Sequence, residues 1–275
     1  MKFSGFICPV CGSFLTYSVV SYRCENNHSF DKAKKGYVNL LQNQGSKNKR
    51  HGDDLEMLKA RESFLSAGFY EPLRNKIAGL ISGFDFANRE ITLADIGCGE
   101  GYYTSYIATY LAEKNPVSVF GIDISKDALA LMHKRLPEAN LAVASMTKLP
   151  FAEGSVDVLM NIFAPYSAGE FSRVLSSDGI FVKVIPLERH LFELKAAVYD
   201  EPYENKVDYG TPVGFEKISF DKVEYKMNLS GQSLIDLFKM TPYYYKTGIG
   251  DQNKITQATQ LEISAEFGIG IYRKS

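Results

Sequence analysis

The sequence predicts an α/β protein with a small metal-binding ribbon at its N-terminus. Two patterns support this: a glycine-rich turn joins a short apolar run to a helical segment, and three of the four cysteines fall within the first 24 residues. The length of 275 residues leaves room for one large domain and a small appendage. Because 45% of the residues are hydrophobic and 23% are charged, the chain can bury a core of its own.

The N-terminal cluster has the spacing of a metal site. Its residues follow the pattern C-x2-C-x12-C-x3-H, namely Cys8, Cys11, Cys24 and His28. Ligands separated by two or three intervening residues fit on tight turns, and three thiolates with one imidazole select zinc. Residues 14–22 have the pattern of a strand or hairpin that brings the two turns together. Because the protein fills all four coordination positions, we predict a structural zinc site.

The overall charge conceals a basic segment. The chain has 31 basic and 32 acidic residues, a net charge of −1. Residues 23–50 hold seven basic and two acidic residues, a net charge of +5, so the remainder carries −6. Such asymmetry is typical of contact with a nucleic acid, although solvated lysine loops are also common. The candidate RNA-contacting residues are Lys32, Lys34, Lys35, Lys47, Lys49 and Arg50.

The glycine-rich stretch has the order strand, turn, helix. An apolar run at 91–96 leads to Gly97, Gly99 and Gly101, and a second apolar run at 117–122 ends in Asp123. This is the pattern of a βαβ unit with an acidic residue at the tip of its second strand. Such a unit binds a nucleoside, because glycines let the backbone approach the ligand and the carboxylate accepts hydrogen bonds from two ribose hydroxyls.

The spacing of the glycines limits which nucleoside is bound. In the dinucleotide fingerprint the glycines run G-x-G-x-x-G, whereas the third glycine here comes one residue early, which disfavours NAD. A Walker lysine is also missing after the turn, which disfavours a triphosphate. The pattern Asp95-x-Gly97-x-Gly99-x-Gly101 resembles motif I of the class I S-adenosylmethionine (SAM) methyltransferases. In those enzymes the turn approaches the amino-acid end of SAM.

The rest of the chain fits the same fold. The expected third to seventh strands are residues 142–146, 156–161, 180–185, 218–229 and 261–272. A turn is expected at 173–179 and a helix near 233–238, with the last two strands antiparallel. The predicted fold is therefore an α/β class I SAM-methyltransferase, with a Rossmann-like, seven-stranded sheet and a small N-terminal zinc ribbon.

The whole chain resembles one family, the bacterial 23S rRNA (guanine-N1)-methyltransferases. The resemblance depends on the zinc ligands and on the strings at residues 36–41, 67–70, 95–104 and 189–191. It implies a zinc-ribbon RNA-recognition domain at 1–45 and a SAM-dependent methyltransferase domain at 46–275, in which 46–90 is a helical lead-in. It also implies transfer of a methyl group from SAM to N1 of a guanine in a hairpin loop of domain II of 23S rRNA.

The resemblance and the fold together predict the cofactor site. By similarity to the family, the residues that contact SAM are Tyr70, Gly99, Glu100 and His190. The fold adds Asp95, Gly97, Gly101, Asp123 and, near the adenine, Ser145 and Met146. A helix at 55–67, capped by Asp53 or Asp54, precedes Tyr70, whose ring is expected to face the cationic sulfonium.

The sequence leaves the catalytic base open. Guanine N1 must lose its proton, and the candidate acceptors by position are Glu100, Asp157 and His190. The turn at 161–166 is where class I enzymes hold the target base, and either Phe163 or Tyr166 could stack on it.

Two other functions stay open. One is a methyltransferase acting on a small molecule, with a ribbon that mediates dimerisation, or on another RNA such as tRNA. The other is a non-catalytic RNA-binding adaptor in which SAM only stabilises the fold. The basic segment favours RNA, and the intact turn with Asp123 favours catalysis. No signal peptide and no run of 18 apolar residues is present, so we expect a cytoplasmic protein without a membrane partner. The expected partner is a 23S rRNA hairpin, and a homodimer is left open.

Overall fold

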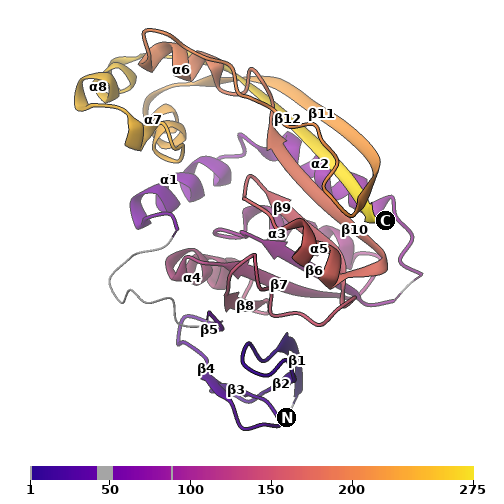
Figure 1. The fold of residues 1–275 in the computed structure, drawn as a ribbon. Coiled ribbons are helices and arrows are strands. Elements are labelled where there is room, and N and C mark those ends of the chain that lie inside the picture. The colour runs from indigo at the N-terminus through magenta and orange to yellow at the C-terminus, as the bar shows by residue number, and fades with distance from the viewer. Residues whose placement is uncertain (1, 42–51, 88) are drawn as a thin grey trace.

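A small antiparallel sheet precedes a large mixed sheet in the computed structural model, which describes residues 2–41, 52–87 and 89–275 (Figure 1). The small sheet has the order β1-β2-β3-β4. Its strands are β1 (Lys2–Ile7), β2 (Phe14–Tyr17), β3 (Ser21–Arg23) and β4 (Ser29–Asp31). Strands β2 and β3 pair antiparallel, which confirms the hairpin expected within residues 14–22.

The large sheet has the order β11-β12-β10-β9-β6-β7-β8-β5. Its strands are β5 (Tyr37–Asn39), β6 (Ile91–Ile96), β7 (Val117–Asp123), β8 (Asn140–Val143), β9 (Val156–Ile162), β10 (Leu175–Pro186), β11 (Phe215–Leu229) and β12 (Leu261–Lys274). All neighbours pair parallel except at β12, which is antiparallel to both β10 and β11. The Rossmann-like sheet and its antiparallel C-terminal pair are therefore confirmed.

The expectation of seven strands is wrong by one, because β5 adds an eighth strand at the edge. It pairs parallel with β8 and buries Val38 completely. The approach is tight at Gly36, whose backbone is left-handed (φ +88°) and where an added Cβ would lie 2.2 Å from the ring of His133. A segment that follows the ribbon thus covers an edge that would otherwise be open for pairing.

Helices cover both faces of the large sheet (Figure 1). They are α1 (Leu55–Ser66), α2 (Glu71–Ser82), α3 (Tyr102–Ala112), α4 (Lys126–Arg135), α5 (Ala168–Val174), α6 (Phe192–Val198), α7 (Gly231–Lys239) and α8 (Ile249–Gln257), with a 3-10 turn, η1 (Tyr244–Lys246). Of the two candidate caps for α1, Asp54 is the one used, since its side chain accepts a hydrogen bond from the Met57 amide at 2.9 Å. None of the described helices has the length and hydropathy needed to cross a bilayer.

Two strand boundaries differ from the prediction. Strand β8 ends at Val143, so the third strand lies about two residues earlier than expected and the residues after it form a loop. Strand β10 begins at Leu175, inside the segment expected to be a turn. Its register against β9 shifts between Leu175 and Ile180, and this irregularity absorbs the extra residues within the strand.

A hydrophobic core lies on each face of the large sheet, because alternate residues of its strands point to opposite sides. In β6, Leu93 belongs to the core covered by α1 to α4 and α6 to α8, whereas Ala94 belongs to the core shared with the ribbon. Phe6 of β1 lies in this second core, with its ring 5.3 Å from that of Phe120 and 5.6 Å from that of Phe151. The ribbon is therefore packed on the sheet rather than tethered to it.

Candidate active site and metal centre

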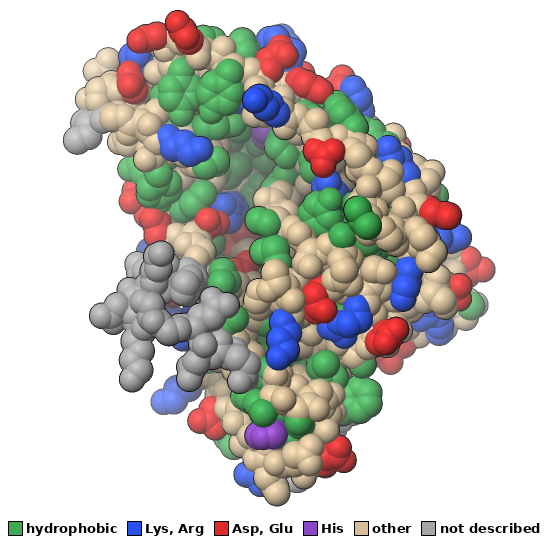
Figure 2. All heavy atoms as spheres, in the orientation of Figure 1, with side chains coloured by type: hydrophobic (Ala, Val, Ile, Leu, Met, Phe, Trp, Pro, Cys, Tyr) green, Lys and Arg blue, Asp and Glu red, His purple; other side chains and the backbone are tan. Residues whose placement is uncertain are grey.

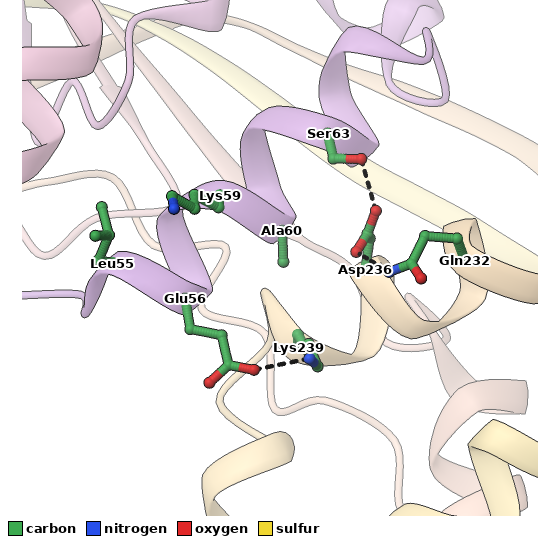
Figure 3. Close-up of a pocket in the computed structure, with 8 residues that line it drawn as sticks. All are labelled: Leu55, Glu56, Lys59, Ala60, Ser63, Gln232, Asp236 and Lys239. Carbon is green, nitrogen blue, oxygen red and sulfur yellow. Dashed lines mark hydrogen bonds and ion pairs between the residues drawn. The ribbon is translucent and has the colours of Figure 1, made fainter.

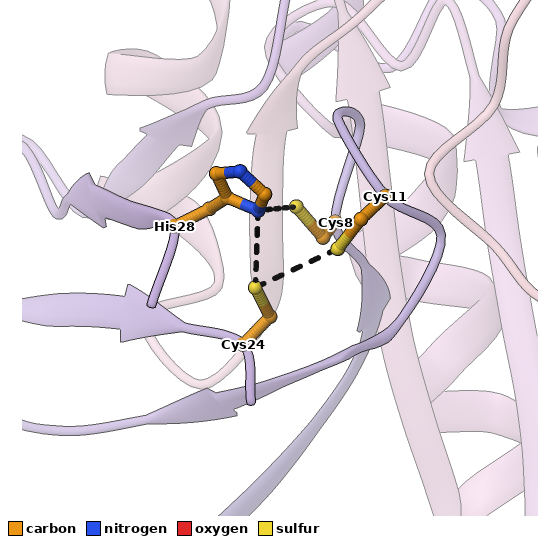
Figure 4. A group of neighbouring side chains, drawn as sticks. All are labelled: Cys8, Cys11, Cys24 and His28. Carbon is orange, nitrogen blue, oxygen red and sulfur yellow. Dashed lines mark hydrogen bonds between the residues drawn. The ribbon is translucent and has the colours of Figure 1, made fainter. Parts of the chain in front are cut away.

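The three cysteines and the histidine converge at one end of the ribbon (Figure 4). Their ligand atoms all lie within 4.8 Å of one another. Cys8 Sγ and Cys24 Sγ lie 3.6 and 3.4 Å from His28 Nδ1, and the Sγ atoms of Cys11 and Cys24 are 3.7 Å apart. A tetrahedral zinc ion with bonds of about 2.1–2.3 Å requires ligand separations of roughly 3.5–3.8 Å. The geometry therefore fits a closed zinc site with no position for water.

Two tight turns deliver the four ligands. In the first, residues 8–12, the Gly12 amide donates to the Cys8 carbonyl and Gly12 is left-handed (φ +79°). In the second, residues 24–28, the Asn27 amide donates to the Cys24 carbonyl with Asn27 left-handed (φ 62°). Hydrogen bonds, first from the Asn26 side chain and then from the Ser13 backbone, lower the pKa of Cys11 to about 5, which favours the thiolate that binds metal.

The glycine turn, residues 97–101, connects β6 to α3 with all three glycines left-handed. A Cβ on Gly97 would lie 2.6 Å from Ala164, and one on Gly101 would lie 2.7 Å from Met132, so packing requires glycine at both positions. At Gly99 the nearest atom to such a Cβ is Arg61 Nη1 at 3.9 Å. The turn is closely packed at its two ends and has room beside Gly99, where a ligand can approach the backbone.

Asp123 is fixed to the glycine turn. It ends β7, and its Oδ2 accepts a hydrogen bond from the Gly99 amide at 2.9 Å while its Oδ1 accepts one from the Ser125 amide at 2.8 Å. Burial raises the pKa of the half-buried carboxylate. Each oxygen keeps a second lone pair for a hydroxyl donor. This is the arrangement expected for a carboxylate that binds the two hydroxyls of a ribose.

Two carboxylate oxygens beside the turn, Asp95 Oδ1 and Glu100 Oε1, are buried without a partner in the described part of the chain. The other oxygen of Asp95 accepts a hydrogen bond from Thr104 Oγ1 at 2.5 Å. Burial raises the pKa of Asp95 to about 7 and raises that of Glu100 above its ordinary value. Unpartnered buried acceptors are costly, so the site lacks a donor group, preferably a cationic one. SAM carries an ammonium and a sulfonium and therefore fits these residues.

Tyr70 and His190, 120 residues apart in the sequence, meet in the core. Tyr70 is the residue before α2, His190 follows β10, and Tyr70 Oη lies 3.4 Å from His190 Nε2. The Glu266 amide donates to His190 Nδ1, so the neutral ring carries its hydrogen on Nε2 and donates it to Tyr70. Burial, helped by the charge of Lys195, lowers the pKa of His190 to about 3. The structure thus brings the two predicted residues together and keeps the imidazole neutral.

Comparisons with known proteins agree with this geometry. The family model described as "RlmA, N-terminal", a zinc ribbon, matches residues 6–49, and the model described as "Methyltransferase domain" matches residues 93–179. The protein YxjB of Bacillus subtilis, described as a 23S rRNA (guanine-N(1)-)-methyltransferase, is 32% identical over 100% of this chain and 99% of its own length. The chain belongs to the 23S rRNA (guanine-N1)-methyltransferase family.

Two more members of the family are similar to parts of the chain. The 23S rRNA (guanine(748)-N(1))-methyltransferase of Streptomyces fradiae is 35% identical over 70% of this chain and 66% of its own length. A protein of Micromonospora griseorubida with a 23S rRNA (guanine-N(1)-)-methyltransferase name is 31% identical over 87% of this chain and 86% of its own length. Like the rest of this methyltransferase family, the chain is a SAM-dependent enzyme with a zinc ribbon.

The sequence did not indicate that this methyltransferase places Arg61 against the glycine turn. Arg61 lies on α1, 38 residues before Gly99, and its Nη1 forms an ion pair with Asp53 Oδ2 at 2.6 Å. Its charge opposes the burial that raises the pKa of Glu100. The backbone before it lies close to the residues that follow Asp123, since a Cβ on Gly52 would lie 3.0 Å from the side chain of Ser125. No local pattern marks these residues, because only the packing of α1 brings them to the turn.

The loop after β8 carries Ser145 and Met146 toward the ribbon. Ser145 lines a groove beside residues 7–12, and Met146 packs against the core shared with the ribbon. The loop begins at the cofactor edge of the sheet, since the Ala144 amide donates to the Asp123 carbonyl at 3.4 Å. The loop therefore runs from the edge of the sheet where the adenine is expected to the metal-binding turn of the ribbon.

The turn after β9 separates its two aromatic rings. Phe163 is left-handed (φ 57°) and 42% exposed, with its ring 5.5 Å from Phe267 and 6.3 Å from Tyr103. Tyr166 packs on the opposite face of the sheet, against Phe171 and Phe181. Only Phe163 therefore lies on the face that holds Tyr70. The turn itself is held by Asn161, whose Nδ2 donates to the carbonyls of Ile96 and Pro165 at 3.0 Å.

The predicted RNA-contacting residues are only partly described. Lys34 and Lys35 are exposed, and Lys35 lies 3.8 Å from an Asp127 oxygen. Lys32 is half-buried and its Nζ lies 4.9 Å above the centre of the Tyr17 ring. The others, Lys47, Lys49 and Arg50, lie outside the described residues.

A second depression lies between α1 and α7 (Figure 3). It measures about 490 Å³, and its acidic groups are paired: Lys239 Nζ with Glu56 at 2.7 Å, and Asp236 with Ser63 and Gln232 at 2.6 and 2.7 Å. These contacts hold α1 on α7 and so help to place Arg61. The space-filling view shows that the molecule is hollowed between the part that contains α6 to α8 and the rest, with charged and apolar side chains inside the hollow (Figure 2).

Proposed function

We propose that this enzyme transfers the methyl group of SAM to N1 of a guanine in a hairpin loop of domain II of 23S rRNA. The observation that carries the proposal is the full-length similarity to YxjB, which spans both the ribbon and the methyltransferase domain. The basic segment beside the ribbon supports an RNA substrate, because exposed Lys34 and Lys35 can contact phosphates. An rRNA substrate implies that the enzyme works in the cytoplasm, where ribosomal RNA is found.

The residues proposed to hold SAM lie around the glycine turn and in the loop after β8. They are Tyr70, Asp95, Gly97, Gly99, Glu100, Gly101, Asp123, Ser145, Met146 and His190. Asp123 is proposed to accept hydrogen bonds from the ribose, and the unpartnered oxygens of Asp95 and Glu100 to face the ammonium. SAM supplies a methyl group made electrophilic by its sulfonium. The protein's part is to align this group with the attacking nitrogen and to exclude water.

The structure separates the three candidate bases. Asp157 lies at the start of β9, away from the glycine turn, and is paired with Arg89 at 2.8 Å and with the Thr92 amide at 2.9 Å. His190 is buried with both nitrogens engaged, and its lowered pKa makes it a weak base. Glu100 has an unpartnered oxygen and a raised pKa, which suits a proton acceptor. That oxygen is also the one proposed to face the ammonium of SAM, so we assign no catalytic base among the three.

Phe163 is the proposed platform for the guanine ring. Its exposed ring lies on the face that carries Tyr70, whereas Tyr166 is packed on the other face. A non-glycine residue held in the left-handed region is strained, and such strain is concentrated at ligand-binding positions. Stacking on an aromatic ring stabilises an unpaired base by about 1–3 kcal/mol.

The test is to incubate the enzyme with labelled SAM and 23S rRNA from a strain that lacks this gene. We expect one labelled nucleotide, identified as N1-methylguanine by digestion and mass spectrometry, and a primer-extension stop in domain II, because N1 methylation blocks Watson–Crick pairing. Label on a cytosine, on a ribose or on no nucleotide would contradict the proposal. Total tRNA from the same strain serves as the control substrate.

A further inference from the structure

A groove separates the first metal-binding turn from the loop after β8. It has a volume of about 340 Å³ and is lined by Ile7, Cys8, Pro9, Val10, Gly12, Leu40, Leu41, Ser145, Thr147, Lys148, Leu149 and Pro150. This volume is at the lower end of the range for small-ligand sites, about 300–1,000 Å³. A single nucleotide fits such a space, whereas a base-paired stem does not.

The lining of the groove has two kinds of surface. Apolar side chains line most of it, and Val10 is 54% exposed at its edge although it lies on the turn that carries two zinc ligands. The polar side is formed by the hydroxyls of Ser145 and Thr147, 2.8 Å apart, and by the ammonium of Lys148. An apolar wall with a few polar groups is the usual construction of a site for a flat heterocycle.

The charge of the groove favours a phosphate. Among its twelve lining residues none is acidic and one is lysine. Lys148 Nζ donates one of its three hydrogens to the Pro9 carbonyl at 3.0 Å, which fixes the ammonium at the groove edge and leaves its other hydrogens for an anion. Leu40 and Leu41 belong to the segment of residues 23–50 with a net charge of +5. Along the chain, these two residues join the groove to this basic segment.

The groove is also next to the cofactor edge of the sheet. Its loop starts at Ala144, whose amide donates to the carbonyl of Asp123, the proposed ribose ligand. The Ile7 amide donates to the Pro150 carbonyl at 2.9 Å, so the ribbon and this loop are fixed to each other. A nucleotide bound here lies at a constant position relative to the glycine turn.

We propose that this groove binds one unpaired nucleotide of the RNA substrate, with its base against Val10 and its phosphate at Lys148. The proposal rests on the proposed function and adds to it a second contact that positions the loop while its guanine is methylated. In this arrangement the zinc ion has a role in recognition, because it holds the turn that forms one wall of the groove.

The test compares two substitutions of the same kind on the ribbon. Val10→Asp places a negative charge in the groove, whereas Val19→Asp places it at an 84% exposed position of the β2–β3 hairpin that does not line the groove. We expect Val10→Asp to raise the KM for a 23S rRNA fragment about tenfold, with zinc content and SAM affinity unchanged. Val19→Asp should keep the KM of the wild type. Equal KM values for the two variants would overturn the groove as a nucleotide site.

A second measurement locates the RNA directly. We expect the same fragment, substituted with 4-thiouridine and irradiated, to form crosslinks to peptides that contain residues 9–12 or 145–150. Crosslinks confined to other peptides would contradict the proposal. So would a Val10→Asp variant with an unchanged KM and a changed oligomeric state, because the groove would then be a contact between copies of the chain. Failure of the wild type to methylate the fragment would overturn the proposed function, while the crosslinks would still test the groove.

Discussion

The metal centre and the cofactor site of this methyltransferase are built in opposite ways. The metal centre takes its four ligands from residues 8–28, within two tight turns of one small sheet. The proposed cofactor site collects groups from the glycine turn, from the end of β7, from the segment after β10, from α1 and from the start of α2. The first site is complete in its ligand set, whereas the second leaves buried oxygens of Asp95 and Glu100 without partners.

This contrast shows how each site responds to change. Four ligands around one ion act together, so the loss of one weakens the whole metal centre. In the proposed cofactor site each side chain would contact a different part of the ligand, so the loss of one side chain should weaken binding only partly. The ribbon and the sheet nevertheless share a core through Phe6, which limits how far damage at the metal spreads.

The largest effect is expected from Cys11→Ser. Loss of the metal should disorder the two ligand turns, and methyl transfer to RNA should fall by at least about 100-fold. SAM affinity should stay within about threefold of the wild type, because its proposed ligands lie on later elements. Metal analysis, calorimetry and hydrogen exchange check these outcomes, and exchange should increase in residues 8–31 but not around Phe6. A metal-free variant with full activity on RNA would show that the ribbon is dispensable.

Asp123→Ala tests whether the cofactor site loses affinity by degrees. Removing a charged acceptor of two hydroxyls should weaken SAM binding by about 1–3 kcal/mol, while the zinc content stays at one ion per chain. Calorimetry measures the affinity, and Asp178→Ala, at an exposed position in β10, is the matched control. Unchanged affinity in Asp123→Ala would mean that the ribose is held elsewhere.

Substitution of both Lys34 and Lys35 by Glu tests the contribution of the ribbon's basic segment to RNA binding, separately from metal and cofactor. Both side chains are exposed, so the double variant should fold and bind SAM as the wild type does. The KM for rRNA should rise about tenfold and its dependence on salt should decrease, because fewer phosphate contacts release counterions. The same reversal at Lys217 and Lys222, on β11, is the control, and an equal effect there would indicate a general charge effect.

The smallest effect is expected in the pH dependence of stability. The pKa of Asp95 is about 7 in the folded protein against an ordinary value of 3.8, so the folded state binds more protons between about pH 4 and pH 7. Without cofactor, the free energy of unfolding should therefore fall as the pH rises through this window. In Asp95→Asn this fall should be smaller, since the amide does not titrate. Urea unfolding at pH 4.5 and pH 7.5 measures the change in the free energy of unfolding. An identical fall in the wild type and the variant would contradict the raised pKa of Asp95.

Local spacing was sufficient to predict the metal centre and the glycine turn. The ligands Cys8 and Cys11, like Cys24 and His28, share one turn, so their distance along the chain determines their distance in space. The same holds for Gly99 and Asp123, which a single βαβ unit joins in a 2.9 Å hydrogen bond. The positions of most strands of the large sheet along the chain were also predictable, because these strands have apolar or alternating patterns.

Packing between distant segments decided the rest. The sequence could not predict that β5 would extend the sheet, that Arg61 would lie beside Gly99 or that Tyr70 would contact His190, since nothing near these residues encodes the partner. It also could not choose between Phe163 and Tyr166, three residues apart, because their rings point to opposite faces of a sheet whose two cores form only in the folded chain. A pattern of residues specifies the groups that one element presents, whereas their partners depend on which elements pack together.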